Sequence, residues 1–208
     1  MGSEFLVSAL VTLVLVVDPI GLVPSFLAIT EGLPAKSRRQ VGVRACIIAA
    51  GILAGTALFG EWLLTRLGIG IPAFRIAGGL LLFSIASEMV FGLRTERQAR
   101  AAEQALEERV RNIAAFPLAI PLMAGPGAIT ATVLLSARAD GQLVPMALLL
   151  AVIAAVCALS LGVDLVASQI ERALGTTGNI VLSRLLGVIL AALAVQYVVD
   201  GIKAVLAT

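Results

Sequence analysis

The segment LVVDPIGLVPSF (Leu15–Phe26) interrupts the first long apolar stretch of the chain with an aspartate, two prolines and a glycine. A proline in a helix interior removes an amide donor and clashes with the carbonyl four residues earlier, which costs about 3 kcal/mol. Inside a membrane, backbone groups freed by such a break are tolerated only where they are buried in protein or line a wet cavity. The segment therefore predicts a broken helix beside a polar cavity.

The composition of the 208-residue chain is that of a membrane protein. It has 60% hydrophobic and 13% charged residues, whereas soluble domains carry about 25% charged residues. A helix needs about 20 mostly apolar residues to cross the hydrocarbon core. Six stretches reach that length: 5–29, 41–64, 71–93, 113–136, 143–167 and 179–206. We therefore expect an all-α protein with six transmembrane helices in a single membrane domain, 1–208.

The distribution of basic residues predicts the orientation. Six spans place successive connections on alternate sides of the membrane, and one side receives eleven of the 15 Lys and Arg residues. The positive-inside rule assigns this side to the cytoplasm. We therefore expect a multi-pass protein of the cytoplasmic (inner) membrane with both termini outside, in the periplasm where the cell has one.

The two halves of the sequence echo each other. DPIG in the first apolar stretch matches GPGA in the fourth, and matching arginine and glycine pairs keep one spacing between the halves. Each half holds three spans, so the second repeat (113–206) would enter the membrane upside down relative to the first (5–93). Such inverted repeats bring two interrupted helices together near the bilayer midplane, where they form a substrate site. The sequence therefore predicts two inverted three-helix repeats, with helices 1 and 4 broken at Pro and Gly.

The linker between the repeats, 94–112, is rich in Ala, Arg and Glu. Ala102, Leu106, Val110 and Ile113 form an apolar stripe at helical spacing. We expect a short cytoplasmic helix near the headgroups, which acts as a solvated connector.

The aspartate in the first break has a structural and a functional interpretation. Aspartate is a favoured N-cap and proline a favoured first helical residue, so Asp18 would cap a half-helix that begins at Pro19, with Gly21 loosening its first turn. An ionisable group at the bilayer centre also costs at least about 2.5–3.5 kcal/mol. This cost favours a functional carboxylate that binds an ammonium group, a cation or a proton.

The second break lacks a capping side chain, because Gly125 stands where the first break has its aspartate. A helix that begins at Pro126 would leave the amides of Gly127, Ala128 and Ile129 without partners, and such a helix end attracts anions. The two breaks together suit a zwitterion. We hypothesise that a small amino acid places its ammonium near the aspartate and its carboxylate near these amides.

Further candidates lie around the breaks. The hydroxyl groups of Ser25 and Thr130 could join the site or bond back to their own helices. Arg75 and Arg184 open the third and sixth spans and are candidates for a gate or a carboxylate clamp, although snorkelling also explains them. Glu88 is a weaker candidate for charge pairing.

Small residues recur where helices are expected to cross. They are Gly51, Gly55, Gly78, Gly79 and Gly187. Small residues let two helix backbones approach closely in a membrane, so packing is the expected role of all five.

The chain resembles the MarC family of six-span bacterial and archaeal membrane proteins, also grouped as a neutral amino acid transporter family. The resemblance rests on four segments: DPIGLVPSFLAIT (18–30), IPAFRIAGGLLLF (71–83), FPLAIPLMAGPGAIT (116–130) and SRLLGVILAALAVQYVVDGI (183–202). It implies transport of small neutral amino acids such as alanine, glycine or serine in a bacterial or archaeal cell. Family members carry Asn or Asp at the position of Asp18, so a charge there is not obligatory.

The favoured function is a secondary transporter with alternating access around the paired breaks. The sequence has no nucleotide-binding motif, so coupling would be to H⁺ or Na⁺, or absent. A passive channel and an exporter of another small solute are the alternatives, and drug efflux is less expected. The expected partners are the amino acid and membrane lipid, with no nucleic acid and no cofactor, and a homo-oligomer is left open.

An enzyme is not expected. The chain has no histidine, which excludes His-dependent triads and His-ligated metals. An aspartyl pair would need a second aspartate near the midplane, whereas Asp164 and Asp200 lie near the ends of their spans.

Overall fold

All regular secondary structure in the described part of the chain is helical, as the composition predicts. The computed structural model describes residues 2–107 and 112–207. In chain order the helices are α1 (Gly2–Val17), α2 (Val23–Ile29), α3 (Ala35–Arg66), α4 (Ile71–Phe91), α5 (Leu93–Glu107), the irregular helix η1 (Ala114–Met123), α6 (Pro126–Ala139), α7 (Leu143–Leu165) and α8 (Ala167–Leu206).

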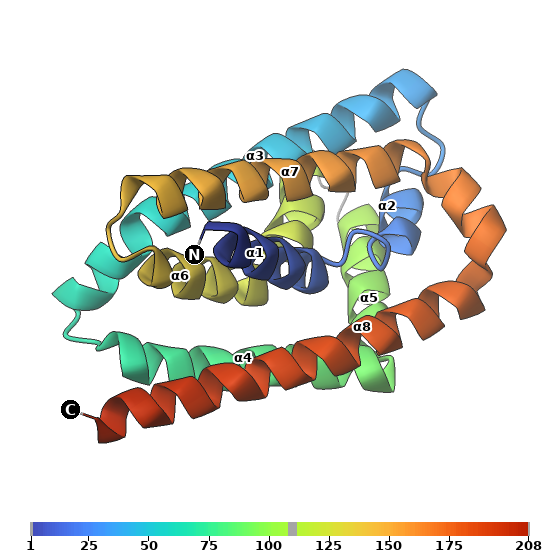
Figure 1. Ribbon diagram of the computed structural model, residues 1–208. Coiled ribbons are helices and arrows are strands. Elements are labelled where there is room, and N and C mark those ends of the chain that lie inside the picture. The colour runs from blue at the N-terminus through green and yellow to red at the C-terminus, as the bar shows by residue number, and fades with distance from the viewer. Residues whose placement is uncertain (1, 108–111, 208) are drawn as a thin grey trace.

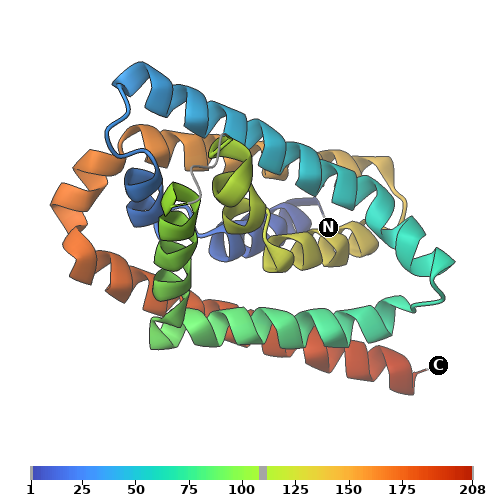
Figure 2. The same cartoon turned by 180° about the vertical axis from the view of Figure 1, so that it is seen from behind.

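Long helices enclose two shorter ones. α1 and α6 lie between the pair formed by α3 and α7 and the pair formed by α4 and α8, and both views show this arrangement (Figures 1 and 2). α1 and α6 contact each other and both pairs. The core of the protein therefore forms around the two elements in which the sequence predicts helix breaks.

Four helices are long and apolar enough to cross a membrane: α3, α4, α7 and the Thr177–Leu206 part of α8. A bent pair, Ala114–Met123 with Pro126–Arg138, gives a fifth span if it is counted as one, with an angle of 57° between its halves. The apolar helix Glu4–Val17 is shorter than a span. The structure thus supports a multi-pass membrane protein, and the count of six spans stays a prediction.

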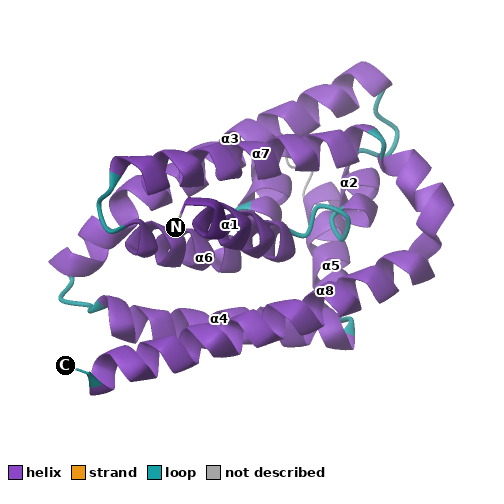
Figure 3. Ribbon diagram, viewed as in Figure 1, coloured by secondary structure: helices purple, strands orange, loops and turns teal. Residues whose placement is uncertain are grey.

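Both predicted helix breaks are present. α1 ends at Val17 and α2 begins at Val23, so a non-helical segment lies between them in the middle of the molecule (Figure 3). The second stretch is interrupted between Met123 and Pro126. It is also irregular upstream of this break, where the extended backbone of Phe116 and Ile120 departs from helical geometry.

The linker is helical but is not simply a solvated connector. A single residue, Gly92, separates α5 from the end of α4. α5 packs against α2, α4 and η1, and two side chains of its first two turns are buried, Arg94 and Gln98. Burial here corrects the expectation of an exposed connector. Of the predicted apolar stripe, Val110 and the side chains of Ala102 and Leu106 lie outside the described residues.

Glycines set the distance between α4 and α8. A Cβ atom at Gly79 would lie 2.8 Å from the carbonyl oxygen of Ala194, and one at Gly187 would lie 3.1 Å from that of Ala86. The expected packing role of these two glycines is therefore supported by their contacts, and a Cβ atom at Gly78 would lie 2.7 Å from the side chain of Thr130 on α6. A Cβ atom at Gly51 or Gly55 would have no described atom of another element within 4 Å, so the same expectation is wrong for them.

Because backbone cannot move aside as a side chain can, Gly187→Leu should force α4 and α8 apart. Overpacking of this kind costs about 1–3 kcal/mol, and we expect a lower thermal unfolding midpoint of the detergent-purified protein. Gly51→Leu is the matched control, since the space beside Gly51 is open. Equal midpoints for the two variants would show that the α4–α8 contact does not limit stability.

Candidate functional site: a cavity at the second helix break

The side chain of Asp18 closes the first break. Asp18 has left-handed backbone geometry (φ 52°), and its Oδ1 accepts a hydrogen bond from the amide of Gly21 at 3.1 Å. A Cβ atom at Gly21 would collide with the Asp18 carboxylate, so this turn requires glycine. The aspartate therefore satisfies the backbone of the turn that it opens.

The half-helix after this turn begins later than the sequence predicts. α2 starts at Val23 with Leu22 as its N-cap, whereas the prediction placed its start at Pro19. The amide of Leu22 bonds to the carbonyl of Asp18 at 3.2 Å, so the turn consumes the residues up to Leu22. Pro24 takes the place in the first helical turn where a missing amide donor costs nothing.

Helix α8 contributes polar side chains to the first break. Ser183 donates a hydrogen bond from Oγ to Oδ2 of Asp18 at 3.4 Å, and Asn179 donates from Nδ2 to the carbonyl of Ile20 at 3.2 Å. The first break is thus filled by protein groups rather than open to a solute.

The second break leaves backbone donors free. α6 begins at Pro126 with extended Gly125 as its N-cap and no side-chain cap, as predicted. The amide of Ile129 bonds to the carbonyl of Gly125 at 3.0 Å, so the prediction that this amide lacks a partner is wrong. The amides of Gly127 and Ala128 have no acceptor among the residues that the structure describes.

Close packing at the second break also depends on glycine. A Cβ atom at Gly125 would collide with the carbonyl oxygen of Pro121, and one at Gly127 would collide with Ile85 of α4 and lie 3.1 Å from Cγ1 of Val16 of α1. The start of α6 therefore lies directly against α1 and α4.

A cavity of about 200 Å³ opens at the start of α6. Its wall includes four residues that the sequence predicts as substrate-binding, Gly125, Pro126, Gly127 and Ala128. The remaining wall comes from η1, from single residues of α1 and α4, and from the first turns of α5. This volume is below the range of about 300–1,000 Å³ that is usual for drug-sized ligands, so the cavity suits a small solute.

Arg94 of α5 is the buried charge in this wall, with 6% of its surface exposed. Its Nη2 donates to the carbonyl oxygen of Val16 at 2.7 Å, and its Nη1 lies 3.2 Å from Sδ of Met89. Val16 lies in the last turn of α1, where carbonyls lack helical partners and a cation is favourable. The guanidinium therefore joins the end of α1 to the cavity at the start of α6.

Two more polar side chains of α5 reach the cavity, Arg97 and the buried Gln98. Arg97 pairs with Glu88 of α4 through contacts of 3.0 and 3.1 Å, and its side chain is 62% exposed. The predicted charge-pairing role of Glu88 thus has a partner on α5. Among the described residues of the wall, both charged side chains are basic.

Charge balance around Arg94 depends on the first break. Burial lowers the pKa of Arg94 from its ordinary value, and the negative charge of Asp18 opposes this change. An arginine remains protonated in such surroundings. Asp18 therefore acts as a counter-charge for the buried guanidinium, as well as an acceptor for the turn.

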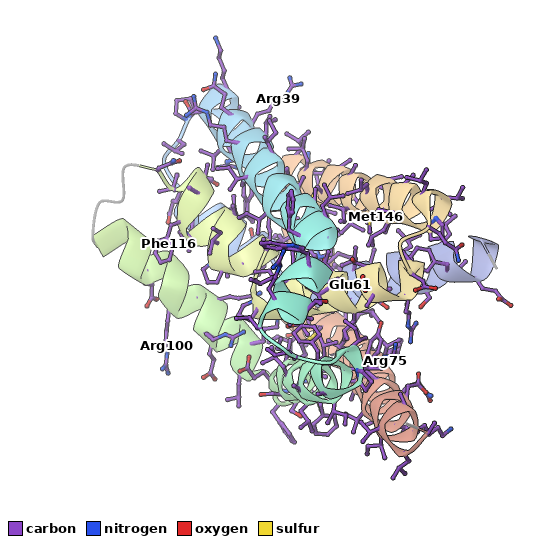
Figure 4. The ribbon with its side chains drawn as sticks, turned by 90° about the vertical axis from the view of Figure 1, so that its left-hand side faces the viewer. Arg39, Glu61, Arg75, Arg100, Phe116 and Met146 are labelled. Carbon is purple, nitrogen blue, oxygen red and sulfur yellow. The ribbon has the colours of Figure 1, made fainter. Side chains whose placement is uncertain are left out.

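The other predicted site residues lie away from the cavity wall. Ser25 is buried on α2 and Thr130 is buried on α6, and neither lines the cavity. Arg75 lies near the start of α4 (Figure 4), whereas Arg184 approaches Gly92 beyond the other end of α4. The 21 residues of α4 span about 30 Å at 1.5 Å per residue. The two arginines therefore cannot act on one solute as a clamp.

Sequence reasoning missed Arg94, which was counted with the basic residues of the cytoplasmic side. A signal for it existed. Arg94 and Gln98 continue the i, i+4 spacing of the predicted apolar stripe that starts at Ala102, towards the start of the helix. Extending the stripe by two turns would have placed both side chains on the packed face of α5.

These features define a multi-pass integral membrane protein with a small, basic cavity at a helix break. A protein-family model described as "MarC family integral membrane protein" matches residues 3–206. The chain therefore belongs to the MarC family, as the sequence motifs indicate.

Relatives occur in both archaea and bacteria. The UPF0056 membrane protein MJ1677 of Methanocaldococcus jannaschii is 39% identical, with 99% of this chain and 100% of the relative covered. The UPF0056 membrane protein YvbG of Bacillus subtilis is 35% identical over 98% and 96% of the two chains. YhcE of Escherichia coli is 34% identical over 91% and 87%. No solved structure matches the chain.

Removal of the Asp18 carboxylate should destabilise the protein, because two hydrogen bonds to it are lost and Arg94 loses its counter-charge. A hydrogen bond to a charged group contributes about 1.5–3 kcal/mol, so we expect Asp18→Ala to lower the thermal unfolding midpoint clearly. Arg94→Met in the same chain should recover part of this loss, because it removes the uncompensated buried charge. Strictly additive effects in the double variant would contradict a coupling between Asp18 and Arg94.

Proposed function

We propose that this protein is a secondary transporter that moves small neutral amino acids, of the alanine, glycine or serine type, across the cytoplasmic membrane by alternating access. The observation that supports the proposal is the cavity at the second break. There, the free amides of Gly127 and Ala128 and the guanidinium of Arg94 line one small volume. Free amides at a helix start and an arginine are both ligands for a carboxylate.

The ammonium group of an amino acid needs acceptors near the same cavity. Prolines remove amide donors from η1, so carbonyl oxygens of this segment are available, and Pro121 itself lines the cavity. Unwound carbonyls of this kind coordinate cations in transporters with broken helices. The predicted ammonium partner, Asp18, does not line this cavity; it lies two residues beyond the Val16 carbonyl that holds Arg94.

The proposed architecture is six spans in two inverted repeats. Both halves of the chain start with an interrupted apolar segment, continue with a long helix and end with a helix of the α4–α8 pair. On this basis α1–α2 corresponds to η1–α6, α3 to α7, and α4 to α8. The excess of basic residues supports an orientation with α5 and its side of the cavity facing the cytoplasm and both termini outside.

Alternating access requires that the opposite route to the breaks is closed in this conformation. Arg138, in the last turn of α6, holds three helices together there. Its Nη1 lies 3.4 Å from Oγ of Ser8 on α1, its Nη2 lies 3.7 Å from Oδ2 of Asp200 on α8, and its guanidinium carbon lies 4.8 Å from the ring centre of Tyr197. We infer that this cluster closes the outer side.

One face of α1 runs from this cluster to the cavity. Ser8, Thr12 and Val16 are spaced by four residues, so they lie on the same face. Thr12 is fully buried, and its hydroxyl group has no partner among the described residues. A buried hydroxyl without a partner between the outer cluster and the cavity supports a polar route that is closed here and opens in another state.

A passive channel is the second candidate, because half-helices can also line a pore. Saturable, stereoselective uptake with counterflow would distinguish a transporter from a channel. An exporter of another small solute would use the same cavity, and would show itself by competition of that solute with alanine.

Uptake of labelled alanine into proteoliposomes tests the substrate and the role of Arg94. We expect saturable uptake that L-alanine blocks, and Arg94→Gln should raise the alanine concentration for half-maximal uptake by about tenfold. The reason is that a hydrogen bond to a charged group contributes about 1.5–3 kcal/mol, and about 1.4 kcal/mol corresponds to a factor of ten.

The control is Arg100→Gln, on the same helix but with an outward-pointing side chain (Figure 4). It should transport like the wild type. No alanine flux from folded wild-type protein would refute the assigned substrate. An equal effect of both substitutions would refute a specific role for Arg94.

The outer cluster gives a second prediction. Arg138→Gln removes a partly exposed ion pair and a cation–π contact, each worth about 1 kcal/mol or less, and a change of this size shifts a two-state equilibrium by about fivefold. A cysteine placed at Thr12, with Cys46 and Cys157 replaced by alanine, should then react faster with a membrane-impermeant maleimide added outside. Lys203→Gln, an exposed change on α8, should leave the reaction rate unaltered.

A further inference from the structure

A second buried acid lies outside the cavity. Asp164, one residue before the end of α7, has only 4% of its surface exposed. Asp18 is also buried, but it accepts hydrogen bonds from Gly21 and Ser183. The Asp164 carboxyl group has no hydrogen-bond or ion-pair partner among the described residues.

Three helices meet at this carboxyl group. A Cβ atom at Gly42 of α3 would lie 3.7 Å from the ring of Phe26 of α2 and 3.8 Å from Oδ2 of Asp164. Phe26 is almost completely buried. The absence of a side chain at Gly42 therefore leaves room for the carboxyl group between α2, α3 and α7.

No counter-charge reaches this junction from the described residues of the helices packed against α7. The thiol of Cys46 on α3 is the nearby titratable group, and Cys157 lies two turns earlier on α7 itself. α2 carries no charged residue, and the arginine of α6 is bound in the outer cluster. On α1, Glu4 lies in the first turn, at the end of the helix far from the break. The remaining charged residues at the same end as Asp164 form no ion pair with it in the described structure: Glu31 before α3, Lys36, Arg38, Arg39 and Arg44 on α3, and Glu171 and Arg172 on α8.

An ionised carboxylate without a partner is very unfavourable in such a place, and a group of this kind becomes neutral instead. Buried acids within membrane helices commonly carry protons in pumps and transporters. We propose that Asp164 is the proton-binding site of this transporter, and that the coupling ion is H⁺; this inference rests on the proposed transport function. The carboxylate takes up one proton from water on one side of the membrane and releases it to water on the other, and no bond in the substrate changes.

The position of α2 connects this site to the helix breaks. α2 has seven residues and follows the turn formed by Asp18 and Gly21, so a rearrangement of that turn moves Phe26. Movement of Phe26 away from Gly42 would admit water to the carboxyl group. Protonation of Asp164 then favours the present packing of α2, and ionisation favours its displacement. Proton binding and substrate binding thereby shift the equilibrium between the same two conformations, with α2 packed as here or displaced.

Infrared spectroscopy of the purified full-length protein tests the protonation state without any substrate. A protonated carboxylic acid has a carbonyl stretching band that a carboxylate lacks. We expect the spectrum of the wild type at neutral pH to contain such a band, and the band to be weaker in Asp164→Asn, where Asp18 remains as a buried acid. Asp140→Asn, at an exposed residue whose left-handed backbone asparagine tolerates, should keep the full band. A band of unchanged intensity in Asp164→Asn would overturn the proposal.

Transport in proteoliposomes tests the coupling. One proton per alanine and a gradient of one pH unit support an accumulation of at most about tenfold, and we expect the wild type to accumulate alanine towards that limit. Asp164→Asn, a fixed neutral side chain of the same shape, should lose accumulation but still exchange labelled for unlabelled alanine. Asp164→Glu should retain accumulation, because it can still bind a proton.

The outcomes separate this inference from the proposed function. Exchange without proton-driven accumulation in the wild type, or accumulation driven by Na⁺, would overturn the inference and leave alanine transport in place. Accumulation that Asp164→Asn retains would do the same. Absence of all alanine flux would refute the substrate, and the infrared band would still decide whether Asp164 carries a proton.

Discussion

The carbonyl groups in the last turn of α1 have no amide partners within the helix, because α1 stops at Val17 inside an apolar segment. A membrane supplies no water to them, so the protein must bring a donor. Arg94 meets this need at Val16, and its charge then requires a nearby anion, which Asp18 provides. The packing of α5 beside the end of α1, and with it one wall of the cavity, depends on this buried guanidinium.

Apolar run length and proline positions suffice to predict the helical class, the four long spans and both helix breaks. Each of these is a local property of the sequence. The exact start of α2 was not predictable in this way, because it depends on the left-handed turn at Asp18 and on hydrogen bonds from Asn179 and Ser183, which lie far away in the chain.

Part of the candidate site was predictable from the sequence, and part was not. The glycines and the proline at the start of α6 could be found from the sequence, because they interrupt an apolar run. Composition alone does not separate Arg94 from the solvated arginines of α5; its helical spacing from the apolar stripe indicates that it faces inward, and the packing of that helix confirms it. Asp164 looked like a residue near a span end, and its isolation becomes visible only when α2, α3 and α7 are seen together.

The two breaks differ in what fills them. At the first break, Asp18 accepts hydrogen bonds within the turn, and Asn179 and Ser183 of α8 donate hydrogen bonds to it. At the second break, the amides of Gly127 and Ala128 have no acceptor among the described residues. Two halves of similar design have therefore taken separate tasks. Within the described residues, the cavity with vacant backbone donors lies at the second break, so the proposed transporter would bind one solute per chain in any assembly that it forms.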